Sequence, residues 1–137
     1  MTVIELPKEI NGAIIASMEG GPIATALPGD KDKEKISAMM AALWSVAKIS
    51  YSKMNKGEFD YIYIKGKQGN LLLFSININT VFAVSTPLDV NLGFVYLECK
   101  RVCKKIMSLM EGKYIKKLIT LKIKDKKIIS LHESETF

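Results

Sequence analysis

Hydrophobic residues near the start of the chain fall into two short runs on either side of a glycine turn. The runs cover residues 13–18 and 22–27, and Glu19, Gly20 and Gly21 lie between them. Glycine reaches the positive φ angles that a tight hairpin turn needs. Both faces of the first run are apolar, so a strand there must be covered above and below. The pattern therefore predicts a buried hairpin.

Apolar residues at helical spacing predict one long helix from residue 32 to about residue 56. Asp30 or Asp32 can cap its start, and Gly57 is expected to end it. The helix carries two apolar stripes, Ile36, Met40, Leu43 and Ala47 on one side and Met39, Ala42, Val46 and Ile49 on the other. A monomeric surface helix needs only one such stripe. The second stripe is therefore expected to meet another molecule.

Three strands and a second helix follow. The strands are predicted over 59–65, 70–76 and 80–86, and residues 66–69 and 77–79 form the turns. Such short connections leave no room for a parallel crossover, so the three strands must be antiparallel neighbours. The second helix is predicted over 91–111, with Asn91 as its N-cap.

The C-terminal part of the chain is rich in lysine. The chain has a net charge of +6, and seven of its 20 basic residues are lysines within 113–137. Two alternating runs, 118–124 and 127–133, joined at Asp125 and Lys126, predict a basic hairpin. We therefore expect a main domain over 1–112 and a lysine-rich extension over 113–137. The extension either binds an acidic surface, membrane or nucleic acid, or only keeps the hairpin soluble.

Few residues in the sequence are candidates for catalysis or for metal binding. Cys99 and Cys103, four apart on a helix, are expected to be small buried hydrophobic residues, and the only histidine, His132, is too distant for a metal site. The sequence contains no catalytic triad and no phosphate-binding loop. We expect no catalytic residue, no metal and no cofactor, so the protein is not expected to be an enzyme. Arg101 is the only arginine, which argues against specific nucleic-acid recognition.

The order hairpin, long helix, three strands and helix resembles the Roadblock (dynein light chain) family over about residues 10–111. The stretches GAIIASMEGGPIATALP, ISAMMAALWSVA, GNLLLFSI, TVFAVSTP and DVNLGFVYLECKRVCKKI carry the resemblance. It implies an α+β class, with the three-layer, profilin-like Roadblock fold. A five-stranded antiparallel sheet would have the long helix on one face and the C-terminal helix on the other. Family members typically form dimers and often bind or regulate Ras-like small GTPases, some as GTPase-activating partners, as in bacterial gliding motility.

Physical arguments also favour a homodimer. The strand 59–65 would lie at a sheet edge, where an aromatic, poorly guarded strand invites further pairing. The expected dimer interface consists of Met39, Ala42, Val46, Ile49, Phe59, Tyr61 and Tyr63. The alternative is that the helix stripe is buried within one chain and Lys65 guards the edge. The partner GTPase is expected to touch Lys35, Lys48, Ser52 and Lys53.

Two functions compete at this stage. The first is a homodimeric regulator or scaffold for a small Ras-like GTPase, and the second is a structural adaptor with no nucleotide-dependent role. Arg101 stands between lysines on a helix, so it is expected to be a solvated surface residue. If the protein stimulates a GTPase, we expect it to act by reshaping the partner's own catalytic loops and not by supplying an arginine. The chain has no signal peptide and no apolar run long enough to span a bilayer, which favours the cytoplasm.

Overall fold

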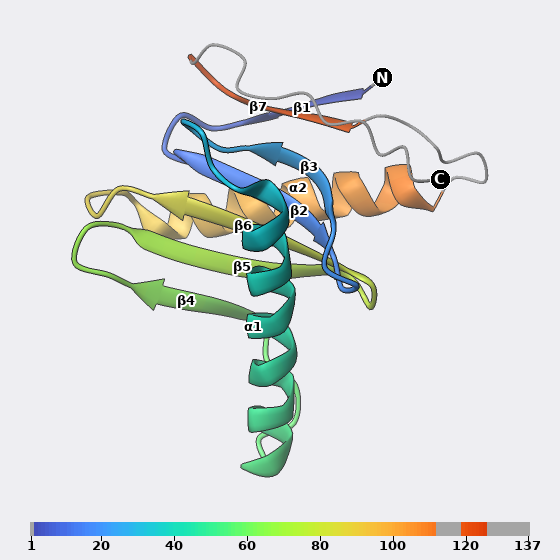
Figure 1. Ribbon diagram of the computed structural model, residues 1–137. Coiled ribbons are helices and arrows are strands. Elements are labelled where there is room, and N and C mark those ends of the chain that lie inside the picture. Colours follow the sequence, from blue (N-terminus) through green and yellow to red (C-terminus); the bar gives the residue numbers. More distant parts are fainter. Residues whose placement is uncertain (1, 112–118, 126–137) are drawn as a thin grey trace.

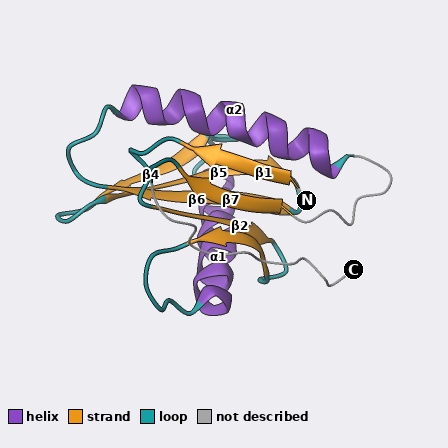
Figure 2. Cartoon of the chain, turned by 90° about the horizontal axis from the view of Figure 1, so that it is seen from above, coloured by secondary structure: helices purple, strands orange, loops and turns teal. Residues whose placement is uncertain are grey.

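The computed structural model describes residues 2–111 and 119–125. Its elements in chain order are β1 Thr2–Leu6, β2 Gly12–Ser17, β3 Pro22–Ala26, α1 Lys33–Lys53, β4 Tyr61–Lys65, β5 Asn70–Asn77, β6 Thr80–Thr86, α2 Leu92–Met110 and β7 Ile119–Ile123. Five strands form an antiparallel sheet in the order β3-β2-β6-β5-β4. Helix α1 crosses one face of this sheet, and α2 covers the other (Figures 1 and 2). The predicted class and layer arrangement are confirmed.

The predicted hairpin is present as β2 and β3. Gly20 has a φ of 104°, which an L-residue with a side chain rarely adopts, and residues 12–16 are all buried. Strand β2 pairs with β3 on one side and with β6 on the other. It is covered on both faces, as its apolar pattern requires.

Helix α1 begins where the sequence predicts and ends earlier. The Asp32 side chain accepts a hydrogen bond from the Lys35 backbone N–H at 3.0 Å, so Asp32 is the N-cap. The helix ends at Lys53, because Asn55 adopts a left-handed conformation with a φ of 59° two residues later. The expectation that Gly57 ends the helix is therefore wrong. Asparagine is one of the few residues other than glycine that tolerate this conformation.

Strands β4, β5 and β6 lie close to their predicted positions. Strand β6 has the expected bounds, β5 runs one residue further than expected, and β4 starts at Tyr61 rather than at residue 59. Gly66 and Gly69 close the β4–β5 turn through a backbone hydrogen bond of 2.9 Å. Helix α2 is capped by Asn91, which accepts a hydrogen bond from the Phe94 backbone N–H. The reading of residues 66–69 as a turn is confirmed.

A small second sheet joins the two ends of the described chain. Strand β7 pairs in parallel with β1, in the register Ile4 with Leu121 and Leu6 with Ile123. The first run of the expected C-terminal hairpin is thus a strand, but its observed partner is β1. The second run, 127–133, lies outside the described residues, so that hairpin stays a prediction.

The core has two parts, one on each face of the main sheet. Between the sheet and the layer formed by α2, β1 and β7 lies the larger cluster, which includes Phe74, Phe82, Ile106 and Leu121. The smaller cluster lies under α1 and centres on Trp44. Because β7 contributes side chains to the larger cluster, residues 119–123 of the lysine-rich segment pack against the main sheet. No helix in the described ranges has the length and apolar character needed to cross a membrane.

Candidate functional site at the sheet edge and long helix

Strand β4 is an edge strand. Within residues 2–111 and 119–125 it pairs only with β5, so its outer backbone N–H and C=O groups have no strand beside them. Unpaired edges of this kind are templates for pairing with another chain. The position predicted for this strand is confirmed.

Helix α1 is longer than the sheet is wide. Its 21 residues give a length of about 32 Å at 1.5 Å per residue, whereas five strands spaced about 4.8 Å apart extend about 19 Å. The helix runs across the strands and its C-terminal half extends past β4 (Figure 1). Every residue from 48 to 58 is exposed, which agrees with this overhang. The overhanging half has no sheet of its own chain beneath it.

The second stripe of α1 faces solvent in the single chain. Met39, Val46 and Ile49 are 55%, 59% and 59% exposed, and Ala42 is exposed as well. The buried line of the helix is instead Ser37, Ala41 and Trp44, which face the sheet. The alternative in which the stripe is buried within one chain is therefore wrong.

The expected aromatic interface residues divide between the two faces of the sheet. Phe59 packs on the α1 side, with its ring 4.7 Å from that of Trp44. Tyr61 packs on the α2 side, where it stacks on Phe74 at 5.3 Å. Tyr63 alternates onto the same face as Tyr61 and stays partly exposed. These three side chains do not form one patch.

The four polar residues expected to contact a partner also separate. Lys35 and Lys53 continue the exposed stripe at helical spacing, one at each end of it. We call this surface, formed by Lys35, Met39, Ala42, Val46, Ile49 and Lys53, the outward face of α1. Lys48 and Ser52 lie on the flank of the helix and line a groove.

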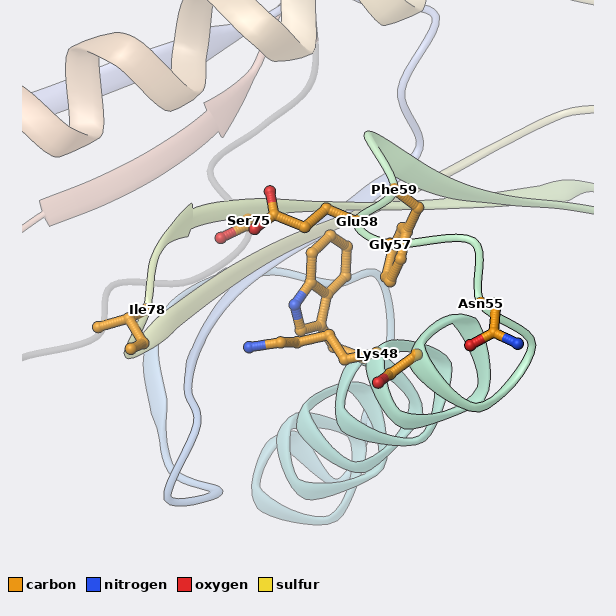
Figure 3. Close-up of a pocket in the computed structure, with 9 residues that line it drawn as sticks. Lys48, Asn55, Gly57, Glu58, Phe59, Ser75 and Ile78 are labelled. Carbon is orange, nitrogen blue, oxygen red and sulfur yellow. The ribbon is translucent and has the colours of Figure 1, made fainter.

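The groove lies between α1, the connection to β4 and the tip of the β5–β6 hairpin (Figure 3). It has a volume of about 750 Å³ and is open to solvent. Its lining residues are Trp44, Lys48, Ser52, Asn55, Gly57, Glu58, Phe59, Ser75 and Ile78. The sequence indicated two of these residues, Lys48 and Ser52, but not the groove, because its walls come from three separate segments.

A polar cluster joins the start of the edge strand to α2. The Asp60 carboxylate accepts a hydrogen bond of 2.5 Å from the Tyr96 hydroxyl and one of 2.9 Å from Lys100. The hydrogen bond from Tyr96, followed by that from Lys100, lowers the pKa of Asp60 below its ordinary value, and the same contact with Asp60 raises the pKa of Tyr96. Sequence patterns do not indicate this cluster, because Asp60 and Tyr96 are 36 residues apart in the chain. The cluster fixes Asp60 at the point where β4 begins.

Arg101 and the two cysteines lie in surroundings that fit structural roles. Arg101 is exposed and donates two hydrogen bonds to Glu98, at 2.9 and 3.2 Å, so it lies on the expected solvated face. Cys99 and Cys103 are buried free thiols, as expected. Burial raises the pKa of the Cys103 thiol to about 12 and raises that of Cys99 as well. Thiols with such pKa values are poor nucleophiles at neutral pH.

Comparison with known proteins agrees with this architecture. The family model described as "Roadblock/LC7 domain" matches residues 5–86. The Methanocaldococcus jannaschii protein MJ1340 is 29% identical over 109 residues, which cover 78% of this chain and 95% of that protein. Among solved structures, Myxococcus xanthus MglB has a TM-score of 0.70 at 16% identity, covering 74% of this chain and 84% of MglB. A Roadblock/LC7 domain from Streptomyces avermitilis has a TM-score of 0.69 at 12% identity, covering 76% and 88%.

The two solved structures share the fold of this chain, but their sequence identities are too low to support any further similarity. The family match is stronger evidence, because it extends from β1 through β6 and so includes the hairpin, the long helix and the edge strand. The chain belongs to the Roadblock/LC7 family.

Proposed function

We propose that this protein is a homodimeric regulator or scaffold that binds a small Ras-like GTPase in the cytoplasm. The observation that carries the proposal is the coincidence of an open β4 edge with a helix that overhangs the same edge. Regulation of Ras-like GTPases is a frequent role in the Roadblock family, and the fold resembles that of MglB.

The dimer follows from pairing two β4 edges about a two-fold axis. Pairing would satisfy the free backbone groups and join two five-stranded sheets into one. The overhanging half of each α1 would then lie over the partner's sheet, beside the partner's α1. Ile64, which is 42% exposed on the α1 side of β4, would be covered together with parts of the Met39–Val46 stripe. A combined strand and helix contact is compatible with the roughly 1,600 Å² of a stable interface.

The docking surface for the GTPase is the outward face of the paired α1 helices. In each helix, the part of the apolar stripe that the dimer leaves uncovered lies between Lys35 and Lys53, with Lys48 and Ser52 on the flank. Apolar centres with charged rims are common at specific interfaces. Arg101 is distant from this surface along the chain and is engaged by Glu98, which supports action through the partner's own catalytic loops.

The test is GTP hydrolysis by a Ras-like GTPase encoded near this gene, measured with and without this protein. A matched pair of variants, Val46→Glu on α1 and Leu97→Glu on α2, places the same charge on two exposed apolar positions of opposite faces. The proposal expects the first to abolish the effect and the second to preserve it. Failure of the wild-type protein to bind or affect any of these GTPases would contradict the proposal.

A structural adaptor is the alternative outcome of the same experiment. A scaffold that does not respond to nucleotide would bind the GTP-bound and GDP-bound partner with equal affinity, because a ligand shifts an equilibrium only through differential binding. Acidic-surface binding by the lysine-rich segment remains a separate prediction, since most of those lysines lie outside the described residues.

A further inference from the structure

The solvent side of α2 combines cations with exposed apolar side chains. The buried line of this helix, which includes Val95, Cys99 and Ile106, packs on the main sheet. The side chains on the other side of the helix lie at helical spacing and are Phe94, Leu97, Lys100, Arg101, Lys104 and Lys105. We call this surface the basic face of α2. Because α1 and α2 cover opposite faces of the sheet, the basic face points away from the outward face of α1 (Figure 2).

The net charge of the chain is concentrated in α2 and in the residues just after it. Residues 100–117 contain seven basic residues and one acidic residue, whereas the rest of the chain contains 13 of each sign. The whole net charge of +6 therefore comes from this one stretch. Lys113, Lys116 and Lys117 lie outside the described residues, so the basic face is defined by α2 alone.

Two of the four cations on the basic face have no carboxylate beside them. Lys100 and Arg101 each pair with one carboxylate at 2.9 Å. Lys104 and Lys105 are exposed and form no ion pair within residues 2–111 and 119–125. These two lysines leave a local positive charge, which an anionic surface would neutralise.

The apolar residues of the basic face favour a lipid surface over a nucleic acid. Leu97 is 66% exposed and Phe94 is 40% exposed, in the turns that precede the cations. The phosphates of a nucleic acid attract the cations, but a leucine has no ring that can stack on a base. At a membrane, cations meet the lipid headgroups while leucine and phenylalanine enter the boundary with the acyl chains.

The proposed homodimer would present two basic faces to one plane. Antiparallel pairing of two β4 edges about a two-fold axis leaves both α2 helices on the same face of the joined sheet. Helix α2 packs over β5, where the Tyr96 ring lies 6.0 Å from that of Phe74. The two helices would therefore lie about 14 Å apart, which is three strand spacings. Two adjacent basic faces bind a planar charged surface more strongly than one, and this step alone rests on the proposed dimer.

We propose that the basic face of α2 docks on a membrane surface that contains anionic lipids. Lys104 and Lys105 lie at the headgroups, and Phe94 and Leu97 enter the interfacial layer. In the dimer, the outward faces of the two α1 helices then point away from the membrane, where a GTPase can reach them. Membrane docking does not require a GTPase, so failure of one proposal is distinguishable from failure of the other.

Vesicle sedimentation tests the proposal. The full chain is mixed with vesicles of phosphatidylcholine alone, or with vesicles in which one lipid in three is phosphatidylserine. We expect the protein to sediment with the anionic vesicles and to stay in solution with the neutral ones. Binding should weaken as salt is added, because salt screens exposed charges.

Two double variants with the same change of charge locate the contact. Lys104→Gln with Lys105→Gln should weaken binding to anionic vesicles at least about tenfold, since each lysine near such a surface contributes about fivefold. Lys35→Gln with Lys53→Gln, on the outward face of α1, should change vesicle binding by less than about twofold. Only the second pair should weaken binding of a GTPase. Circular dichroism checks that each variant is folded.

A third variant tests the apolar part of the basic face. Leu97→Ser should weaken binding to anionic vesicles about threefold or more, because an apolar side chain is lost from the interfacial layer. Ile78→Ser is the matched control, since Ile78 is 80% exposed in the β5–β6 turn, away from α2. We expect this control to bind the vesicles as wild type does.

Three results would overturn the proposal. The first is equal sedimentation of the wild-type protein with neutral and anionic vesicles. The second is equal vesicle binding by the two double variants. The third is tighter binding of a duplex DNA than of the anionic vesicles, together with no effect of Leu97→Ser, which would identify a nucleic acid as the partner of this face.

Discussion

Replacement of Leu121 by alanine tests whether the lysine-rich C-terminal segment belongs to the folded unit. Leu121 lies in β7, is fully buried and pairs with Ile4 of β1. Its side chain belongs to the large cluster beneath α2. The substitution removes buried methyl groups and leaves a cavity that the surrounding side chains fill only in part.

The expected loss of stability is large. Leucine-to-alanine changes at buried positions cost about 2–5 kcal/mol, which is a substantial part of the roughly 5–15 kcal/mol that stabilises a typical domain. For a chain of 137 residues, 1 kcal/mol corresponds to about 3–5 °C in Tm. A loss of about 3 kcal/mol therefore lowers Tm by about 10 °C or more.

Thermal and urea unfolding followed by circular dichroism measure this change. Val3→Ala is the matched control, because Val3 lies on the neighbouring strand with half of its surface exposed. We expect the control to shift Tm by no more than a few degrees. Equal Tm values for Leu121→Ala and Val3→Ala would refute the reasoning and would show that the strand after α2 is an independent extension. For the same reason, a chain that ends at Glu111 should be less stable than the full chain, because it lacks β7. Charge-neutralising variants are therefore a better test than truncation of whether the lysines bind an acidic surface.

Three further predictions concern α2 and its contacts. Asp60→Asn should lower stability at neutral pH by no more than about 1 kcal/mol, since the pair with Lys100 is exposed. Folding lowers the pKa of Asp60 below 3.8, so the contribution of Asp60 to the free energy of unfolding is present above that pH and is lost as the pH falls through the folded-state pKa. The stabilities of wild type and variant should therefore converge in acid. A stability difference that stays constant with pH would contradict this. Cys103 should react with a thiol reagent at pH 8 only as fast as the protein opens, and rapid labelling of the native protein would show that the thiol is accessible. Arg101→Ala should leave any stimulation of a GTPase unchanged, whereas a loss of several hundredfold would identify a catalytic arginine.

The sequence was most informative where the signal is local. Asn91 caps α2 at the predicted residue, and β6 has its predicted bounds, because a capping residue and a short apolar run between turn residues are signals within or next to the element that they define. The β2–β3 hairpin was predictable for the same reason, since its turn and both strands are adjacent in the chain.

Contacts between distant segments were not predictable in this way. The alternation of Ile119, Leu121 and Ile123 indicates a strand, but nothing near it identifies β1 as its partner more than 100 residues earlier. The two stripes of α1 were recognised, yet the fully buried line, Ser37, Ala41 and Trp44, lies beside the first stripe on the side away from the second, because the sheet lies under that side of the helix. The Asp60 cluster and the groove likewise depend on residues brought together only by the fold.

The mass of the protein in solution is the most direct test of the account, since the docking platform exists only if two β4 edges pair. Light scattering on an eluting peak at micromolar concentration should give twice the 15.3 kDa of the chain. Ile64→Lys, which places a charge at the open edge and changes no buried side chain, should give a folded particle of 15.3 kDa. A wild-type protein that is folded and has the mass of one chain would contradict the dimer, and with it the proposed platform for a GTPase.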